Sequence, residues 1–202
     1  MTARIQTGFT FTTGVHFNNK FYMNNYDLDV TFMVESEIIH EQNIALERIR
    51  YFLEYVISNA IFINQVEEVA INKYIDAGIR LCTLPEEPYD QIIGIMLLTK
   101  MNALTEGRLV VSDIAISSTM SEGVSCLYSM EENLGPFADK GWWNSSQIDI
   151  NDIKPKNKKI VKLNTTKNVW EELSLGYLKL DEDIPSDVQN IVFATFDTKT
   201  DK

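Results

Sequence analysis

The chain is poor in the residues that build metal centres and disulfide frameworks: it has two histidines and two cysteines among 202 residues. The cysteines, Cys82 and Cys126, are far apart in sequence and make neither a disulfide framework nor a four-ligand zinc site. The first residues lack the apolar segment of a signal peptide, and no apolar run approaches the roughly 18 residues of a membrane span. We therefore expect a cytoplasmic protein with reduced thiols and no membrane partner.

Positive charge is also scarce, since 18 Lys and Arg face 29 Asp and Glu for a net charge of −11. Nucleic acids and anionic membranes attract basic proteins, so neither is expected as a partner. Nine glycines and five prolines exclude collagen-like and low-complexity classes, and a hydrophobic content of 45% fits a globular domain. The sequence contains no motif typical of nucleotide hydrolysis, dinucleotide binding or triad hydrolysis.

Two segments near the start alternate in character with a period of two. In residues 9–12 phenylalanines alternate with threonines, and in residues 26–34 every second residue is apolar. This period, with aromatic and β-branched residues, predicts two strands. The polar, asparagine-rich stretch 16–25 between them favours a connection.

The next part of the chain changes to helical spacing. Apolar residues predict one amphipathic helix over about residues 45–60 and a second from Pro88 to Gly107. Residues 66–77 continue a helical pattern, and residues 79–84 form a short apolar run of undecided type. Residues 109–117 and 124–130 are strand-like, which gives the order β-β-α-α-β-β with an extra helical piece between the long helices.

The composition changes after about residue 135. Residues 1–135 carry 8 basic and 18 acidic side chains, whereas residues 136–202 carry 10 and 11. We expect residues 1–135 to form one domain. Residues 136–202 are expected to be a C-terminal extension that packs on this domain or on a neighbouring subunit, with Trp142 and Trp143 as apolar anchors.

The element order resembles the tunnelling fold, or T-fold, and residues 20–32 are similar to a strand of the 6-pyruvoyl-tetrahydropterin synthase family. The family strand opens Lys-Leu-His-Gly-His-Asn-Tyr, and this chain reads Lys-Phe-Tyr-Met-Asn-Asn-Tyr from Lys20. Tyr22 and Asn24 stand where the family has two zinc-binding histidines. Residues 11–16 resemble the family's Phe-Ser-Ala-Ala-His with one residue extra, which leaves His16 as the remaining ligand position.

The resemblance covers residues 9–132 and implies an α+β, T-fold-like antiparallel β-sheet with two long helices on one face. The family's Pro-Thr-x-Glu-Asn is echoed by residues 88–91, which include Asp90, and Glu122 is the carboxylate nearest to the family's substrate-anchoring Glu. The family's Asp-His pair falls on residues 57–60, which carry no titratable group. The candidate ligand-binding residues are therefore His16, Tyr22, Asn24, Asp90 and Glu122, and we expect no catalytic residue, metal or cofactor.

The residues leave three functions open. The favoured one is a non-catalytic binding or structural protein on a T-fold scaffold that has lost the zinc centre, because His16 alone cannot supply three ligands. The alternative is an enzyme that acts on a pterin- or purine-like ring with altered active-site groups. A third reading is an unrelated structural or assembly protein. The resemblance implies a homo-oligomer joined through strand edges, with a small heterocyclic ligand as a further partner.

Asp113 is a carboxylate outside these motifs, and it lies in an otherwise apolar predicted strand. We expect it to form a structural ion pair with Arg108, and an orientation into a pocket stays open as the alternative.

Overall fold

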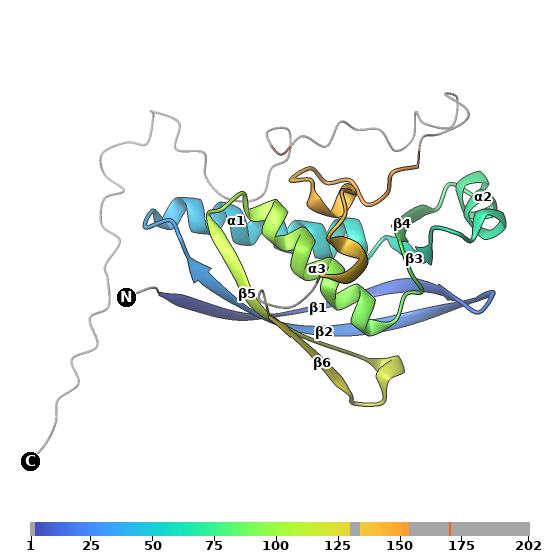
Figure 1. The fold of residues 1–202 in the computed structure, drawn as a ribbon, viewed down its shortest axis with the longest axis horizontal. Helices are drawn as coiled ribbons and strands as arrows, with labels where there is room; N and C mark the ends of the chain where they lie inside the picture. The colour runs from blue at the N-terminus through green and yellow to red at the C-terminus, as the bar shows by residue number, and fades with distance from the viewer. Residues whose placement is uncertain (1–2, 130–133, 154–169, 171–202) are drawn as a thin grey trace, which may run out of the picture.

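The computed structural model describes residues 3–129, 134–153 and 170, which contain one six-stranded sheet and the helices that pack on it (Figure 1). The strand order in the sheet is β4-β3-β1-β2-β5-β6. The strands are β1 (Arg4–Phe17), β2 (Lys20–Val34), β3 (Ala60–Asn64), β4 (Arg80–Leu84), β5 (Leu109–Ser118) and β6 (Ser125–Ser129). The helices are α1 (Ile39–Tyr51), which continues as the π-helical turn η1 (Phe52–Ile57), α2 (Glu68–Asp76) and α3 (Asp90–Thr105), with short 3-10 turns η2 (Thr119–Ser121), η3 (Gly135–Phe137) and η4 (Trp142–Asn144).

Strands β1 and β2 form one long antiparallel hairpin, so the predicted connection over residues 16–25 is wrong. The register pairs residues continuously from Arg4 with Met33 to Phe17 with Lys20. The turn consists only of Asn18 and Asn19, whose φ angles are 50° and 59°. Asparagine tolerates this left-handed conformation, and a two-residue turn of this kind matches the twist of the flanking strands. The asparagines of the segment therefore mark a tight turn and the polar ends of two strands.

The predicted α+β T-fold-like architecture is confirmed. Strands β1, β2, β5 and β6 pair antiparallel in this order, and the long helices α1 and α3, which connect β2 to β5, cover one face of them (Figure 1). Along β2, Leu28, Val30 and Phe32 are buried beneath the helices, whereas Asp27 and Asp29 between them are exposed. This alternation fixes the register, because a slip of one residue would expose the whole apolar set.

The extra helical piece predicted over residues 66–77 is α2, but the sequence did not predict the strands β3 and β4 on either side of it, which complete a unit inserted between the two long helices. Strand β3 pairs parallel with β1 and β4. Every residue of β3 is buried, since Phe62 joins the main core and Ile61 and Ile63 pack with Ile71 of α2 on the opposite face. A strand buried on both faces has no period of two, which explains why residues 61–64 were not predicted as a strand and residues 79–84 stayed undecided.

Helix α3 lies very close to the sheet at Gly94. A Cβ atom there would be 2.7 Å from the ring of Tyr128 and 2.9 Å from Ile116. Only glycine allows this close approach without a shift of the neighbouring side chains. The contact holds the N-terminal half of α3 against β5 and β6.

Residues 134–153 pack on the same chain, over α3 and beside β4. The backbone N–H of Thr83 donates to the carbonyl of Ile150, and the amide of Asn151 donates to the carbonyl of Leu81 at 2.8 Å. Trp142 and Trp143 are both buried, and Trp142 Nε1 donates to the carbonyl of Thr83 at 2.9 Å. The segment therefore covers the outer edge of β4, and the domain boundary near residue 135 stays a prediction.

Two strand edges remain without a strand partner among the described residues. Strand β1 pairs with β3 only at Gly14 and Val15, so its segment from residue 4 to residue 13 is open on that side. Strand β6 has β5 on one side and no described strand on the other. An open edge carries unpaired backbone donors and acceptors, which proteins usually pair or cover.

Candidate ligand-binding site

A cavity of about 410 Å³ opens where β2, the first turn of α3 and the η2–β6 connection meet. Its size is in the range of small-molecule sites. The close approach of α3 to the sheet at Gly94 brings the first turn of the helix near this end of β2. The residues that line the cavity are Val15, Phe17, Asn24, Tyr26, Pro88, Tyr89, Asp90, Gln91, Met120, Ser121, Val124 and Cys126.

Asn24 ties β2 to the turn that borders the cavity. Its side chain is buried with 2% exposed, and its Oδ1 accepts hydrogen bonds from Thr119 Oγ1 at 2.7 Å and from the backbone N–H of Met120 at 3.2 Å. An amide oxygen has two lone pairs, and both are occupied here. The Asn24 amide NH₂ is therefore the group that remains for other contacts.

Tyr26 lies two residues further along β2 on the same face, and only 1% of it is exposed. Its ring stacks on Phe11 with centroids 5.0 Å apart. Burial raises the pKa of Tyr26 above its ordinary value; the Asn24 side chain opposes this, and the charge of Asp90 adds to it. The Tyr26 hydroxyl is buried without a hydrogen-bond partner in the part of the chain that the structure describes.

Asp90 is the first residue of α3, where the positive end of the helix favours an acidic side chain. The residue is half-buried, and its Oδ2 atom is buried and has no hydrogen-bond partner among residues 3–129, 134–153 and 170. Leaving a buried polar atom unpaired costs about 1–3 kcal/mol. Two residues that line the cavity, Tyr26 and Asp90, therefore each carry a buried polar atom without a partner among the described residues.

The other walls of the cavity are mainly apolar. Phe17 meets Tyr89 edge to face with ring centroids 5.1 Å apart, and Val15, Met120 and Val124 supply aliphatic surface. An apolar hollow with a few polar atoms at fixed positions is typical of sites for small organic molecules.

The structure brings together two of the five predicted ligand-binding residues, Asn24 and Asp90. Tyr22 is half-buried on the same face of β2, and Glu122 is exposed in the turn after η2; neither is among the residues that line the cavity. His16 lies on the other face of the sheet, where its Nδ1 is 2.9 Å from the hydroxyl of Tyr74 in α2. Their assignment as ligand-binding residues stays a prediction.

The single extra residue in residues 11–16 explains the position of His16. In the β1–β2 register, Tyr22 pairs with Val15 and Asn24 with Thr13, whereas His16 pairs with Phe21. Directly paired residues point to the same face, so the extra residue puts His16 on the face opposite Tyr22 and Asn24.

The residues at these positions of β1 and β2 do not fit the three-histidine zinc site of the family that the sequence resembles. Val15, Tyr22 and Asn24 share the face where three histidines would converge, and none of them is a ligand that zinc favours. Among the described residues, no three His, Cys, Asp or Glu side chains are grouped to hold a metal ion. The predicted absence of zinc nevertheless remains a prediction to be measured.

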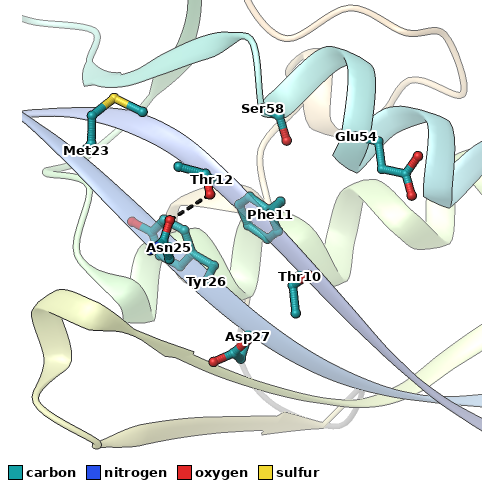
Figure 2. Close-up of a pocket in the computed structure, with 9 residues that line it drawn as sticks. All are labelled: Thr10, Phe11, Thr12, Met23, Asn25, Tyr26, Asp27, Glu54 and Ser58. Carbon is teal, nitrogen blue, oxygen red and sulfur yellow. Dashed lines mark hydrogen bonds between the residues drawn. The ribbon is translucent and has the colours of Figure 1, made fainter.

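A second, more open hollow of about 610 Å³ lies along the open edge of β1 (Figure 2). Polar residues of the outer sheet face, among them Thr12 and Asn25 with an oxygen–oxygen distance of 2.6 Å, line it together with Glu54 and Ser58 from the end of the first helix. The residues in this hollow are Thr10, Phe11, Thr12, Met23, Asn25, Tyr26, Asp27, Glu54 and Ser58. Of the described residues that line this hollow, only Tyr26 has a buried side-chain oxygen or nitrogen without a hydrogen-bond partner.

Sequence reasoning missed Tyr26 as a site residue. Its place in an alternating strand predicts only a core side chain, and the sequence gives no sign that its hydroxyl is left without a partner. The expected pairing of Asp113 with Arg108 is wrong: Asp113 is exposed and accepts a hydrogen bond from Ser112, whereas Arg108 pairs with Glu41 and Glu106. Because Asp113 belongs to the outer, solvated set of β5, it needs no ion pair.

Comparisons with known proteins give matches in structure alone. No protein-family model matches the sequence, and no curated protein matches it. An uncharacterized protein from Wolinella succinogenes is similar with a TM-score of 0.45 and 10% identity, covering 65% of this chain and 99% of that chain. A catalytic-residue mutant of Plasmodium vivax 6-pyruvoyltetrahydropterin synthase is similar with a TM-score of 0.42 and 9% identity, covering 63% and 97%.

Matches of this level carry no residue roles to this chain, so the site is interpreted from its own side chains. No helix in the described part of the chain is long and apolar enough to cross a membrane.

Proposed function

We propose that the protein is a non-catalytic, oligomeric T-fold protein that binds a small planar ligand in the cavity between β2 and α3, without a zinc centre. The observation that carries the proposal concerns two residues that line a cavity with mainly apolar walls. Tyr26 and Asp90 each carry a buried polar atom, Oη and Oδ2, without a partner among the described residues. A ligand that pairs with both atoms removes a cost of about 1–3 kcal/mol for each.

The non-catalytic part of the proposal is supported by the chemistry of the side chains. The cavity contains no histidine, and the two histidines of the chain are His16, on the other sheet face, and His40 at the start of α1. Proton transfer near neutral pH most often uses histidine. Asn24, at a family ligand position, is held by Thr119 and Met120 of the neighbouring turn.

The oligomeric part is supported by the two open edges. Strands β1 and β6 run antiparallel and terminate opposite sides of the four-stranded part of the sheet. Pairing β6 of one copy with the open segment of β1 in the next would be antiparallel. Such head-to-tail contacts generate a ring when the rotation closes.

Pterin and hypoxanthine are suitable planar probes for the proposed site. We expect saturable binding of at least one of them by isothermal titration calorimetry, with the same affinity before and after treatment with EDTA. Tyr26→Phe and Asp90→Ala should each weaken this binding about tenfold, because each removes a hydrogen bond in a buried site.

Exposed residues outside the cavity supply matched controls. Tyr55→Phe and Asp76→Ala change the same chemical groups at exposed positions and should leave the affinity unchanged. Absence of saturable binding of both probes would contradict the ligand-binding proposal. Binding that disappears with EDTA and returns with zinc would contradict its metal-free part.

A further inference from the structure

Trp170 belongs to the C-terminal extension and fills a slot on helix α1. Only 4% of the residue is exposed. Its Nε1 donates to the carbonyl of Ser146 at 2.7 Å. The guanidinium carbon of Arg48 lies 5.0 Å from the centroid of the indole, and the ring of Tyr51 meets it edge to face at 6.2 Å. The slot thus gives the indole an acceptor for its N–H, a cation for its face and an aromatic neighbour.

Arg48 is held in place by contacts that do not involve Trp170. Its Nη1 donates to the carboxylate of Glu106 at 2.7 Å and to the carbonyl of Leu104 at 3.3 Å, both at the C-terminal end of α3. A wall fixed in this way keeps its shape when the slot is empty, which lowers the cost of binding an occupant.

The Ser146 carbonyl is fixed from the other side of the slot. Ser146 stands between Ser145 and Gln147, whose carbonyls accept hydrogen bonds from the buried Lys100 of α3 at 2.8 and 2.7 Å. Both polar walls of the slot are therefore anchored to α3, and Trp170 links α1 to the segment 134–153.

Arg48 also carries an atom that the indole leaves unpaired. Its Nε is buried and has no hydrogen-bond partner in the described part of the chain. A carboxylate is the acceptor that a guanidinium N–H favours, and the two residues that follow Trp170 in the sequence are Glu171 and Glu172. An occupant with an acidic group beside its indole therefore fits the slot better than an indole alone.

We infer that this slot is a peptide-docking site on the helical layer, and that its occupant is the segment of the same chain that begins Trp170-Glu171-Glu172, with the indole as the anchor and an acidic side chain paired with Arg48 Nε. Arg48, Tyr51 and Ser146 lie outside the set of residues that lines the cavity, so the inference does not depend on the proposed ligand. A segment joined to its site by the chain has an effective concentration on the order of millimolar. The chain's own segment therefore excludes a free peptide of the same sequence.

A labelled peptide of residues 165–175 tests the slot in the full-length protein. Trp170→Ala empties the slot, so fluorescence anisotropy should show saturable binding of the peptide to this variant and at least about tenfold weaker binding to the unmodified protein. The same peptide with alanine in place of tryptophan should not bind. A peptide with glutamine in place of both glutamates should bind about tenfold more weakly, because it loses the charge-assisted hydrogen bond.

Variants of the slot assign the binding to its walls. Added to Trp170→Ala, Arg48→Met should abolish peptide binding, whereas Arg50→Met removes a more exposed arginine of the same helix and should leave the binding unchanged. Thermal unfolding of each variant confirms that it is folded.

Tryptophan fluorescence gives a second readout that needs no peptide. All three tryptophans of the chain are buried, so acrylamide should quench the unmodified protein weakly. Tyr51→Ala removes the aromatic neighbour of Trp170 and should raise the quenching constant about twofold by opening the slot. Tyr89→Ala, which removes an exposed tyrosine, is the matched control and should leave the constant unchanged.

Four results would contradict the inference. Failure of the peptide to bind folded Trp170→Ala, or equal binding to this variant and to the unmodified protein, would overturn the docking slot. Unchanged quenching in Tyr51→Ala would overturn it as well. Equal binding of the glutamate and glutamine peptides would overturn the pairing with Arg48. A lower mass of Trp170→Ala than of the unmodified protein in sedimentation velocity would show that the slot takes Trp170 of another copy, which would overturn docking within the chain.

Discussion

Replacing Trp142 with alanine should lower the free energy of unfolding by about 3–5 kcal/mol, the usual cost of truncating a buried tryptophan. The side chain is buried between β4 and α3, donates to the carbonyl of Thr83 and meets Trp143 edge to face. Urea denaturation followed by circular dichroism measures the loss. Trp142→Phe should keep part of the lost stability, because it retains a ring and loses only the N–H and some area.

An exposed apolar residue gives the control for this change. Ile39→Ala removes aliphatic surface that is mostly in solvent and should cost less than about 0.5 kcal/mol. A loss below about 1 kcal/mol for Trp142→Ala would mean that residues 134–153 are not integrated into the core.

Lys100→Met should lower the free energy of unfolding by about 3 kcal/mol, because it leaves buried carbonyls without donors. Lys100 is fully buried in α3, and its Nζ donates to the carbonyls of Trp142, Ser145 and Gln147 at 3.0, 2.8 and 2.7 Å. The ammonium thereby holds the C-terminal segment on the helix. Lys140→Met, which removes an exposed lysine of the same segment, is the matched control.

The pH dependence gives a second readout for Lys100. Burial lowers the pKa of Lys100 to about 8 from the ordinary 10.5, although Asp149, Cys82 and Asp152 oppose the shift. Between these two pH values the unfolded chain binds more protons than the folded one, so this lysine should raise the free energy of unfolding as the pH increases from 8 to 10.5. The rise should be absent in Lys100→Met. Equal pH dependence in both proteins, or a loss below about 1 kcal/mol at pH 7, would contradict this role.

Much of the fold could be predicted from apolar residues that recur with a regular period. The alternation in residues 26–34 predicts the single apolar face of β2, and the helical spacing from Pro88 to Gly107 predicts α3, although residues 134–153 cover this helix on its outer side as well. The inserted strands β3 and β4 could not be predicted, although the helix α2 between them was, since Ile61 and Phe62 are buried on opposite faces of one strand. Burial on both faces removes the period on which such predictions depend.

The candidate site was only partly predictable for a related reason. Asn24 and Asp90 were predicted because they align with residues in a strand and a helix of the family that the sequence resembles. The resemblance predicted that His16 lies near them. The face of the sheet on which a side chain lies depends on the strand register, and the one extra residue in residues 11–16 puts His16 on the opposite face. The role of Tyr26 depends on a missing hydrogen-bond partner, which only the three-dimensional arrangement of Asn24, Asp90 and η2 reveals.

The most direct test of the account as a whole is the sedimentation of the intact chain, because an oligomeric T-fold requires its open edges to be paired. Sedimentation velocity at micromolar concentration should give one species whose mass is a multiple of 23.1 kDa and does not change over a tenfold range of concentration. A single species of 23.1 kDa would contradict the pairing of β6 with the open segment of β1.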